Sequence, residues 1–473
     1  MHNRAASVAR AVLACLVLLC GAAAPAAARQ PPPAQGAETS SEEEVAAASQ
    51  AEPAPPESEN SGRKPIALAQ EFRLSTALWP GSVASGVDRF WGEIEYRPRA
   101  TGTRSRVSGA AELLFRASMS GFALSPDDSR ADGGERGLRI QSDRQAAIVK
   151  ELSVSVHAPV DLVIGWQILS WGHATDGVRV LDVFQRQDLT DRLRPEPLGI
   201  PAVSASFGNR GWETEAVWVP GAISDRLAAS PSNVWYAFPR SSTVAEVDTG
   251  APGFSLSHGE VGIRVSRYGQ HGDIALMAAR TRDRVPSAVE LRRDASTGEL
   301  QARSLFEPYW LVGASAVRTA GSYLLRAEAL HATYSDAASA VVKSGIRAVA
   351  GVERRISAST DSHYTLIAQY AMDTTGSEQV VQDGAFLSSP FRIYGHALTA
   401  SATAAWRRQY QLETRLMRGL DHGSTVASAK LGYTHNDHLT IWIAADQVGG
   451  RAGSWLERLD AADRILVGVN VNR

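Results

Sequence analysis

The sequence predicts an all-β protein: a transmembrane, antiparallel, up-and-down β-barrel of about eighteen strands that follows a disordered N-terminal tail. Two observations lead to this fold class. From Leu68 onward apolar and polar residues alternate with a period of two, which places the two sets on opposite faces of a strand. The connections between these segments are alternately short and long, which is the layout of outer-membrane barrels.

The first 28 residues have the three parts of a secretory signal peptide. Arg4 and Arg10 precede an apolar run over residues 11–20, and small residues end at 26–28. This pattern predicts export and cleavage before Arg29. A retained anchor is the less favoured alternative.

Both cysteines of the chain, Cys15 and Cys20, lie inside this signal segment. The mature protein is therefore expected to have no disulfide, no thiolate metal ligand and no cysteine nucleophile.

Residues 29–65 form a distinct second segment. Their central part, 31–62, is rich in proline, alanine, glutamate and serine and contains no aromatic residue. Such a composition buries too little apolar surface to offset the entropy of ordering, so we expect a disordered periplasmic tail. The tail is either a solvated linker or, through residues 30–62, a docking segment for a periplasmic protein.

Residues 66–473 are expected to form the barrel itself. The alternation is clearest at residues 107–117, 410–416, 439–445 and 465–471. Two of the outer connections, 80–88 and 420–422, are short, so sixteen strands is a possible alternative to eighteen. The predicted strands lie near 70–79, 89–97, 105–118, 146–157, 160–170, 201–208, 211–219, 256–267, 271–281, 305–318, 321–334, 345–356, 361–372, 391–405, 407–419, 423–435, 437–447 and 462–471.

Aromatic residues gather near the ends of the predicted strands. This distribution fits the aromatic girdles that mark the two interfaces of a membrane barrel. The residues concerned are Trp79, Phe90, Trp91, Trp166, Trp171, Trp212, Trp218, Tyr309, Trp310, Tyr323, Tyr334, Tyr410 and Trp455.

The charged residues of the alternating segments are expected to line the lumen. Both signs occur in near balance, which argues against a lumen built for one polyanion. Such residues either set selectivity or form ion-pair networks that brace the barrel. The candidates are Glu112, Arg116, Glu213, Glu215, Glu260, Arg264, Arg326, Glu328, Arg347, Glu353, Arg355, Glu413 and Arg415.

Other function classes find little support in the sequence. The formal net charge is −2, and no concentrated basic face suggests binding to nucleic acid. No nucleophile-elbow or zinc-helix motif occurs, so we expect no enzyme activity, no catalytic residue, no cofactor and no metal.

The segment from Gly165 to Leu189 is the most distinctive part of the sequence, with Gln167, Trp171 and Gly172 near its start. It resembles a poorly characterised family of proteobacterial outer-membrane barrels whose signature is a W-G-x-x-D-G stretch followed by D-V-x-N-P-x-D-L. Residues 150–152 and 212–220 resemble further landmarks of that family, and 326–328 and 351–354 do so more loosely. The sequence departs from the signature at residues 185–186, which read Gln-Arg, and by one extra residue after Gly172.

The same segment supplies the candidates for a constriction loop: Trp171, Gly172, Asp176, Gly177, Asp182 and Asp188. Trp171 and Gly172 at a strand end suggest an interfacial anchor followed by a bend. The three aspartates could accept hydrogen bonds from backbone amides and fold the loop inward. An ordered loop without a ligand, a constriction that contacts solute, and a divalent-metal site all remain open.

The family resemblance implies transport of a solute, lipid, hydrophobic compound or polysaccharide across the outer membrane. We therefore expect a porin-like channel in the outer membrane of a Gram-negative cell, in contact with its lipid and lipopolysaccharide. The alternatives are a filled structural barrel that anchors an envelope complex and, less favoured, a barrel-embedded enzyme.

Overall fold

A computed structural model of the protein describes residues 66–79, 90–121, 139–140, 146–173, 178–228, 233, 235, 244–248, 255–293, 300–335, 342–359, 361–375, 386–388, 395–421, 423–450 and 463–473. The predicted signal peptide and tail, residues 1–65, lie outside these ranges. Among the described residues, no helix combines the length and apolarity needed to cross a membrane.

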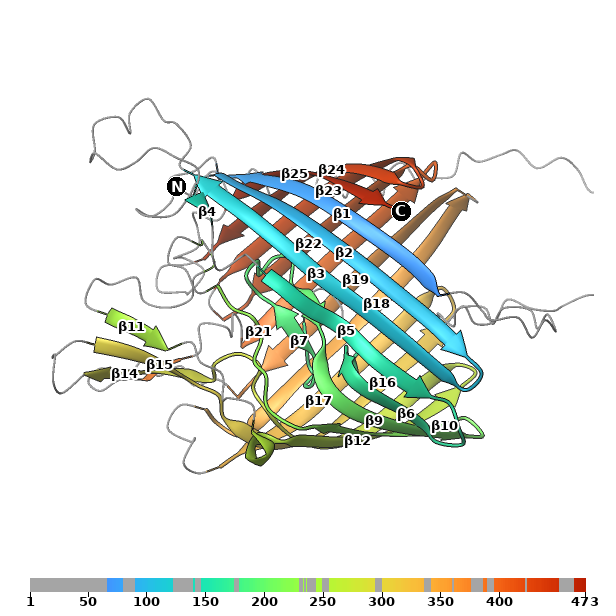
Figure 1. Ribbon diagram of the computed structural model, residues 1–473, viewed down its shortest axis with the longest axis vertical. Coiled ribbons are helices and arrows are strands. Elements are labelled where there is room, and N and C mark those ends of the chain that lie inside the picture. Colours follow the sequence, from blue (N-terminus) through green and yellow to red (C-terminus); the bar gives the residue numbers. More distant parts are fainter. Residues whose placement is uncertain are drawn as a thin grey trace, which may run out of the picture.

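Eighteen antiparallel strands form one closed barrel, as the sequence predicts (Figure 1). Each barrel strand pairs with the next along the chain, and β1 pairs with β25 from Glu71↔Asn472 to Leu78↔Ile465 to close the barrel. Every predicted strand overlaps one of the observed strands. These are β1 (Ala67–Leu78), β2 (Phe90–Arg104), β3 (Val107–Gly121), β5 (Ala146–Val156), β6 (Asp161–Gln167), β9 (Ile200–Asn209), β10 (Trp212–Val219), β12 (Glu260–Gly269), β13 (Gly272–Arg282), β16 (Pro308–Ala320), β17 (Tyr323–Tyr334), β18 (Gly345–Ser359), β19 (Ser362–Asp373), β21 (His396–Trp406), β22 (Tyr410–Gly419), β23 (Thr425–Asn436), β24 (Leu439–Gly449) and β25 (Arg464–Asn472).

The two faces of the barrel wall differ in polarity. On β24, Ile441 and Ile443 point outward and are 45% and 50% exposed, whereas Ala444 and Asp446 point inward and are buried. The other strands share this alternation. Closure leaves no unpaired strand edge, so a barrel with an apolar outer surface can satisfy its backbone groups in contact with lipid tails.

The barrel has a short-turn end and a long-loop end. At the short-turn end, Arg407 and Arg408 both have positive φ angles, 53° and 56°, between β21 and β22. Two successive residues of this kind match the twist of antiparallel strands and form a tight hairpin. The beginning of β1 and the end of β25 also lie at this end.

Aromatic side chains mark both ends of the outer surface. At the short-turn end, Trp212 and Tyr323 are exposed and lie 5.4 and 5.2 Å from the guanidinium carbons of Arg267 and Arg354. Trp310 is exposed near the long-loop end.

The expected girdle is nevertheless only partly correct. Five of its predicted members are buried, because they pack inside the barrel in two buried apolar clusters. They are Trp79, Trp91, Trp171, Tyr309 and Tyr334. Trp455 lies outside the described residues.

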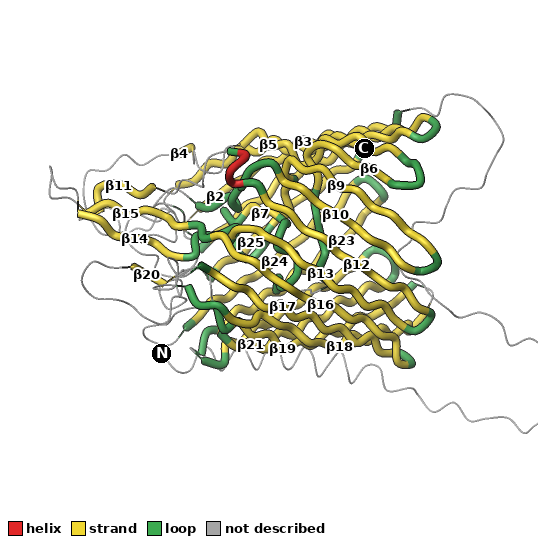
Figure 2. Tube along the Cα trace, turned by 90° about the horizontal axis from the view of Figure 1, so that it is seen from below, coloured by secondary structure: helices red, strands yellow, loops and turns green. Residues whose placement is uncertain are grey.

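Smaller elements lie at the long-loop end. One sheet contains β11 (Val244–Asp248), β15 (Leu300–Leu305), β14 (Ala288–Arg293) and β20 (Phe386–Ser388), and Figure 2 shows it beyond the ends of the barrel strands. Strand β4 (Arg139–Ile140) extends the edge of β3, and a 3₁₀ helix, η3, spans Leu256–His258. A two-stranded sheet of β7 (Arg186–Asp188) and β8 (Glu196–Leu198) lies instead inside the barrel.

The chain leaves the wall after β6 and returns to it at β9 at the same level. Gln167, the last residue of β6, is the cross-strand partner of Ile200, the first residue of β9. The buried Gln167 amide joins both strands, because Nε2 donates to the Ala202 carbonyl at 2.9 Å and Oε1 accepts from the Ser204 hydroxyl at 2.9 Å. Residues 168–199 between these two strands are called the inward loop below.

The assignment of the apolar residues to the outer, lipid-facing surface can be tested directly. Ile443→Arg places a charge on the lipid-facing surface near mid-barrel, where it should cost about 2–4 kcal/mol. Thr403→Arg is the matched control, since Thr403 lies opposite Glu413 on the inner face. Folding into lipid vesicles, followed by the change of gel mobility on boiling and by urea titration, should be impaired only for Ile443→Arg. Equal effects of the two substitutions would show that the two faces are assigned wrongly.

Candidate functional site

The inward loop crosses the interior of the barrel. Asp188 in β7 contacts Arg116 of β3, with 2.5 Å between Oδ2 and Nη1. Arg194 contacts Asp446 of β24 at 2.6 Å, and the amide of Leu181 donates to the carboxylate of Glu328 on β17 at 3.4 Å. These strands belong to different parts of the wall, so the loop spans the lumen and narrows it.

An apolar core holds one side of this loop. Trp171 meets Phe184 edge to face, with 5.0 Å between the ring centroids, and both rings are buried. Leu181 lies over Gly313 of β16, and Phe184 lies over Gly262 of β12. Trp171 therefore anchors the loop inside the barrel and does not lie at the membrane interface, because the inner wall facing it is apolar. The buried cluster also includes Val178, Val180, Val183, Ile200, Val217, Val219, Met277, Tyr309, Leu311, Leu330, Tyr334 and Val349.

Asp182 closes the first turn of the loop. Its Oδ1 accepts hydrogen bonds from the Gly172 amide at 2.7 Å and from the Ser170 hydroxyl at 2.9 Å. A Cβ on Gly172 would lie 2.8 Å from Oδ2 of Asp182, so glycine permits this close approach. Asp176 and Gly177, the other two candidates of this stretch, lie outside the described residues.

The backbone of His173 is clamped by the wall. Its amide donates to the carboxylate of Glu328, and its carbonyl accepts from Arg326 Nη1 at 3.1 Å. Burial, together with the nearby cations Arg264 and Arg326, lowers the pKa of His173. The ring therefore adds no charge to the lumen at neutral pH.

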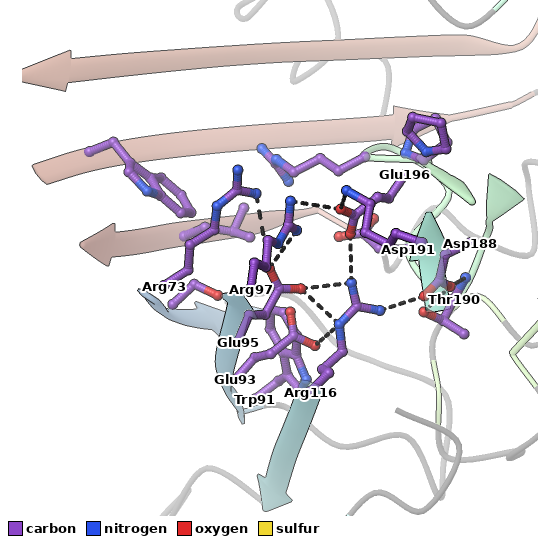
Figure 3. A pocket seen from close by; sticks show the side chains of 17 residues that line it. Arg73, Trp91, Glu93, Glu95, Arg97, Arg116, Asp188, Thr190, Asp191 and Glu196 are labelled. Carbon is purple, nitrogen blue, oxygen red and sulfur yellow. Dashed lines mark hydrogen bonds and ion pairs between the residues drawn. The ribbon is translucent and has the colours of Figure 1, made fainter. Parts of the chain in front are cut away.

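Arg116 is the centre of the polar side of the site (Figure 3). Its buried guanidinium lies 2.5 Å from Asp188 and 3.1 Å from Glu196, both in the inward loop. On the wall it lies 2.6 Å from Glu95 and 3.4 Å from Glu93, both on β2. One side chain thus joins two carboxylates of the wall to two of the loop.

Glu196 in β8 is the corresponding centre on the loop. Its carboxylate lies 2.7 Å from Arg97, 3.1 Å from Arg116 and 2.9 Å from Lys150. Lys150 faces inward because of a β-bulge: Glu112 pairs with Glu151 and the next residue, Leu113, pairs with Val149, which leaves Lys150 as the extra residue. Bulges commonly redirect a side chain in this way.

Asp188 is charged over nearly the whole pH range. Burial raises its pKa, but the cations Arg116 and Arg226 and two hydrogen bonds from Thr190 outweigh burial and lower the pKa to about 2. The hydroxyl and amide of Thr190 donate to Oδ1 at 2.6 and 3.0 Å, and Arg226 Nη1 lies 2.9 Å from Oδ2.

A second ionic cluster fixes the loop to a nearby part of the wall, because β25 is joined to β3 through β1 and β2. Arg464 of β25 is fully buried and contacts Asp446 of β24 at 2.7 Å and Asp191 of the loop at 2.8 Å. Arg194 of the loop shares Asp446. The guanidinium of Arg464 also lies 5.7 Å from the ring centroid of Trp235, so a second connection, between β10 and β12, packs here too.

A cavity of about 400 Å³ remains between the inward loop and the wall. Its lining carries five basic residues, Arg73, Arg97, Arg116, Lys150 and Arg194, and five acidic residues, Glu93, Glu95, Asp188, Asp191 and Glu196. The formal charges of this lining therefore cancel. Trp91, Trp442 and Leu466 complete it with apolar surface.

The structure places the sequence-predicted lumen residues on the inner face, but brings only some of them together. Glu112 and Arg116 contribute to the ionic cluster beside the cavity, and Arg326, Glu328 and Glu353 to the clamp on His173. Arg264 lies near His173, and Arg355 contacts Glu353 at 2.7 Å. The remainder lie elsewhere on the inner wall: Glu213, Glu215, Glu260, Arg347, Glu413 and Arg415.

Several residues of the site were not singled out from the sequence. The series Glu93, Glu95, Arg97 on β2 has a recognisable signal, since charges at every second position belong to one face. No such sequence signal marks Asp191, Arg194 and Glu196, because they lie in an irregular loop and contact partners that are distant in the sequence. Among the described residues, no group of three or more histidine, cysteine, aspartate or glutamate residues is placed to hold a metal ion.

Comparison with known proteins gives structural similarity alone. No protein family and no curated protein matches the sequence. A triple mutant of the porin of Rhodopseudomonas blastica is similar in structure with 13% identity over 86% of this chain and 100% of the porin, at a TM-score of 0.37. OmpF of Salmonella typhi in complex with daunomycin is similar with 8% identity over 87% of this chain and 98% of OmpF, at a TM-score of 0.41.

Similarity of this degree says nothing about function. The resemblance of residues 165–189 to a poorly characterised barrel family stays a prediction.

The low pKa of Asp188 predicts how the loop responds to acid. The pKa falls from 3.8 to about 2, so the carboxylate stabilises the folded loop by about 2 kcal/mol. This stabilisation is complete above about pH 4 and is lost as the pH falls through about 2. Hydrogen exchange of the amides of residues 186–198, corrected for intrinsic rates, should show constant protection down to about pH 4 and a decline below it.

Asp188→Asn provides the comparison for that experiment. This substitution should lower the hydrogen-exchange protection of residues 186–198 at neutral pH. It should also remove the part of the decline in acid that comes from protonation of Asp188. A variant with the same acid response as the unmodified protein would show that Asp188 does not hold the loop.

Proposed function

We propose that the protein is an outer-membrane channel for small hydrophilic solutes and that the inward loop forms its constriction. The observation that supports passage of solutes is the solvent exposure of charged side chains on the inner face near the short-turn end. Arg99 and Arg355 are on that face, yet their side chains are 55% and 62% exposed. Charged side chains inside a closed barrel keep such exposure only where water enters, so this part of the lumen is a water-filled vestibule.

The charges at the constriction favour weak ion selectivity. Each of the five cations in the cavity lining lies within ion-pair distance of a carboxylate, and the formal charges of the lining cancel. Rings of unpaired like charge select ions, whereas paired charges leave little net potential along the path. The ion pairs thus position the loop, in addition to lining the lumen.

The proposed location follows from the sequence together with the barrel. Export by a cleaved signal peptide would deliver the chain to the periplasm, and insertion would leave the short-turn end facing it. The outer surface would contact lipid and, near the long-loop end, lipopolysaccharide. Residues 30–62 would extend from the periplasmic mouth, where a protein partner could bind them.

A second function has an observation in its favour. Two buried apolar clusters occupy part of the lumen, one on the inward loop and one around Trp235. A barrel filled in this way could serve as a structural anchor for an envelope complex, acting through its N-terminal tail.

Conductance separates the two functions. Because Gln167 and Ile200 are cross-strand partners, a two-residue Asn-Gly turn can replace residues 168–199 without altering the register of β6 and β9. In planar bilayers the unmodified protein should give discrete conductance with weak ion preference. The loop-deleted protein should conduct several-fold more and admit larger solutes.

Deletion of residues 30–62 is the control and should leave conductance unchanged. Silence of both the unmodified and the loop-deleted protein would contradict a channel. Loss of a cellular phenotype on deleting the tail alone, with conductance intact, would favour the anchor.

A further inference from the structure

The lining of the cavity beside the inward loop combines two chemically different sets of side chains. Trp442 of β24 and Leu466 of β25 are apolar members, and the ion pairs around Arg116 and Glu196, which Figure 3 shows, are the polar members. Its volume of about 400 Å³ lies within the range of about 300–1,000 Å³ that holds small organic ligands. Water reaches it, since Arg73 and Arg194 in its lining are 38% and 31% exposed.

The position of Trp442 depends on its neighbours. The indole is half-buried, and its Nε1 donates to Asn470 Oδ1 at 3.2 Å. A Cβ on Gly468 would lie 2.3 and 2.5 Å from two atoms of the indole ring, so any side chain at this position would displace the tryptophan. Glycine at residue 468 thus allows an aromatic platform to lie on the inner wall at the edge of the cavity.

The polar side offers donors and acceptors close together. Arg97 and Arg116 present guanidinium N–H groups, and Glu95 and Glu196 present carboxylate oxygens, with 2.6–3.1 Å between paired atoms. A hydroxyl group donates one hydrogen bond and accepts others, so a solute with several hydroxyls can use both kinds of group. The apolar face of such a solute suits an aromatic ring.

We propose that this cavity is a binding subsite for a neutral, polyhydroxylated solute of mono- to disaccharide size. This inference rests on the proposed channel function and names the class of solute for the same site. An anion would need an excess of basic residues, and the lining has none. An apolar solute would displace water from the ion pairs without forming hydrogen bonds in place of those that the water made, and this desolvation is unfavourable in free energy.

Sucrose is the probe for the experiment. Added to open channels in planar bilayers, it should interrupt the current in proportion to its concentration. Trp442→Ala should raise the half-blocking concentration at least tenfold, because the platform is lost, while Trp442→Phe should keep most of the affinity. Gly468→Ala retains the indole but displaces it, and should weaken blockage in the same direction. Trp310→Ala, on the lipid-facing surface, is the matched control and should change nothing.

Calorimetric titration of the detergent-solubilised protein with sucrose gives a readout that does not need conductance. Binding that weakens in Trp442→Ala supports the subsite even if the bilayers are silent, in which case only the channel function fails. Conductance without any effect of sucrose, blockage that Trp442→Ala leaves unchanged, or equally strong blockage by gluconate would overturn the inference and leave the channel standing.

Discussion

The contact of Arg116 with the carboxylates around it is the interaction on which the interior of the barrel depends. It joins Glu93 and Glu95 of the wall to Asp188 and Glu196 of the inward loop in one buried cluster. A guanidinium buried without partners would be strongly unfavourable, and so would the carboxylates without it; loss of one partner of a buried pair typically costs about 3–5 kcal/mol. The loop, the cavity and the width of the lumen are therefore linked to this one side chain.

Two kinds of interaction hold the loop from different directions. Trp171 and Phe184 bury it against the apolar wall of β12 and its neighbours, and Arg116 and Arg464 hold its polar side. Hydrophobic packing is not directional, so it holds the loop against the wall without selecting particular partners. The ion pairs are directional and fix which loop residues meet which strands. A segment anchored in both ways belongs to the most stable part of a structure and not to the readily opened part. In the proposed channel, the constriction would therefore be a fixed narrowing.

The sequence predicts the barrel well because its rules are local. Alternation along each strand and tight turns between neighbours determine which residues face lipid, and pairing of consecutive strands follows from the short connections. The inner apolar wall also has a signal. Residues 309–312 read Tyr-Trp-Leu-Val, an unbroken apolar run, which indicates apolar surroundings on both faces of the strand: Tyr309 and Leu311 are buried inside, and Trp310 and Val312 are on the outer surface.

The site is much less predictable, because its contacts join distant parts of the chain. Arg464 meets Asp191 across a separation of 273 residues, and neither the strand period nor the loop composition indicates that pair. The spacing of Asp182 and Asp188 in the sequence is enough to select both as candidates, but the two carboxylates make different contacts in the structure. Asp182 satisfies a backbone amide and a hydroxyl, whereas Asp188 also takes two arginines that only the folded barrel brings to it.

A double-mutant cycle between Arg116 and Asp188 tests the central claim most directly. Arg116→Met, Asp188→Leu and the double variant would be compared with the unmodified protein by hydrogen-exchange protection of residues 186–198. Each single variant leaves a buried charge with fewer partners, so both should lose much of the protection, and the double variant should recover part of it. Strictly additive losses, or single variants as protected as the unmodified protein, would contradict the claim that this contact holds the loop.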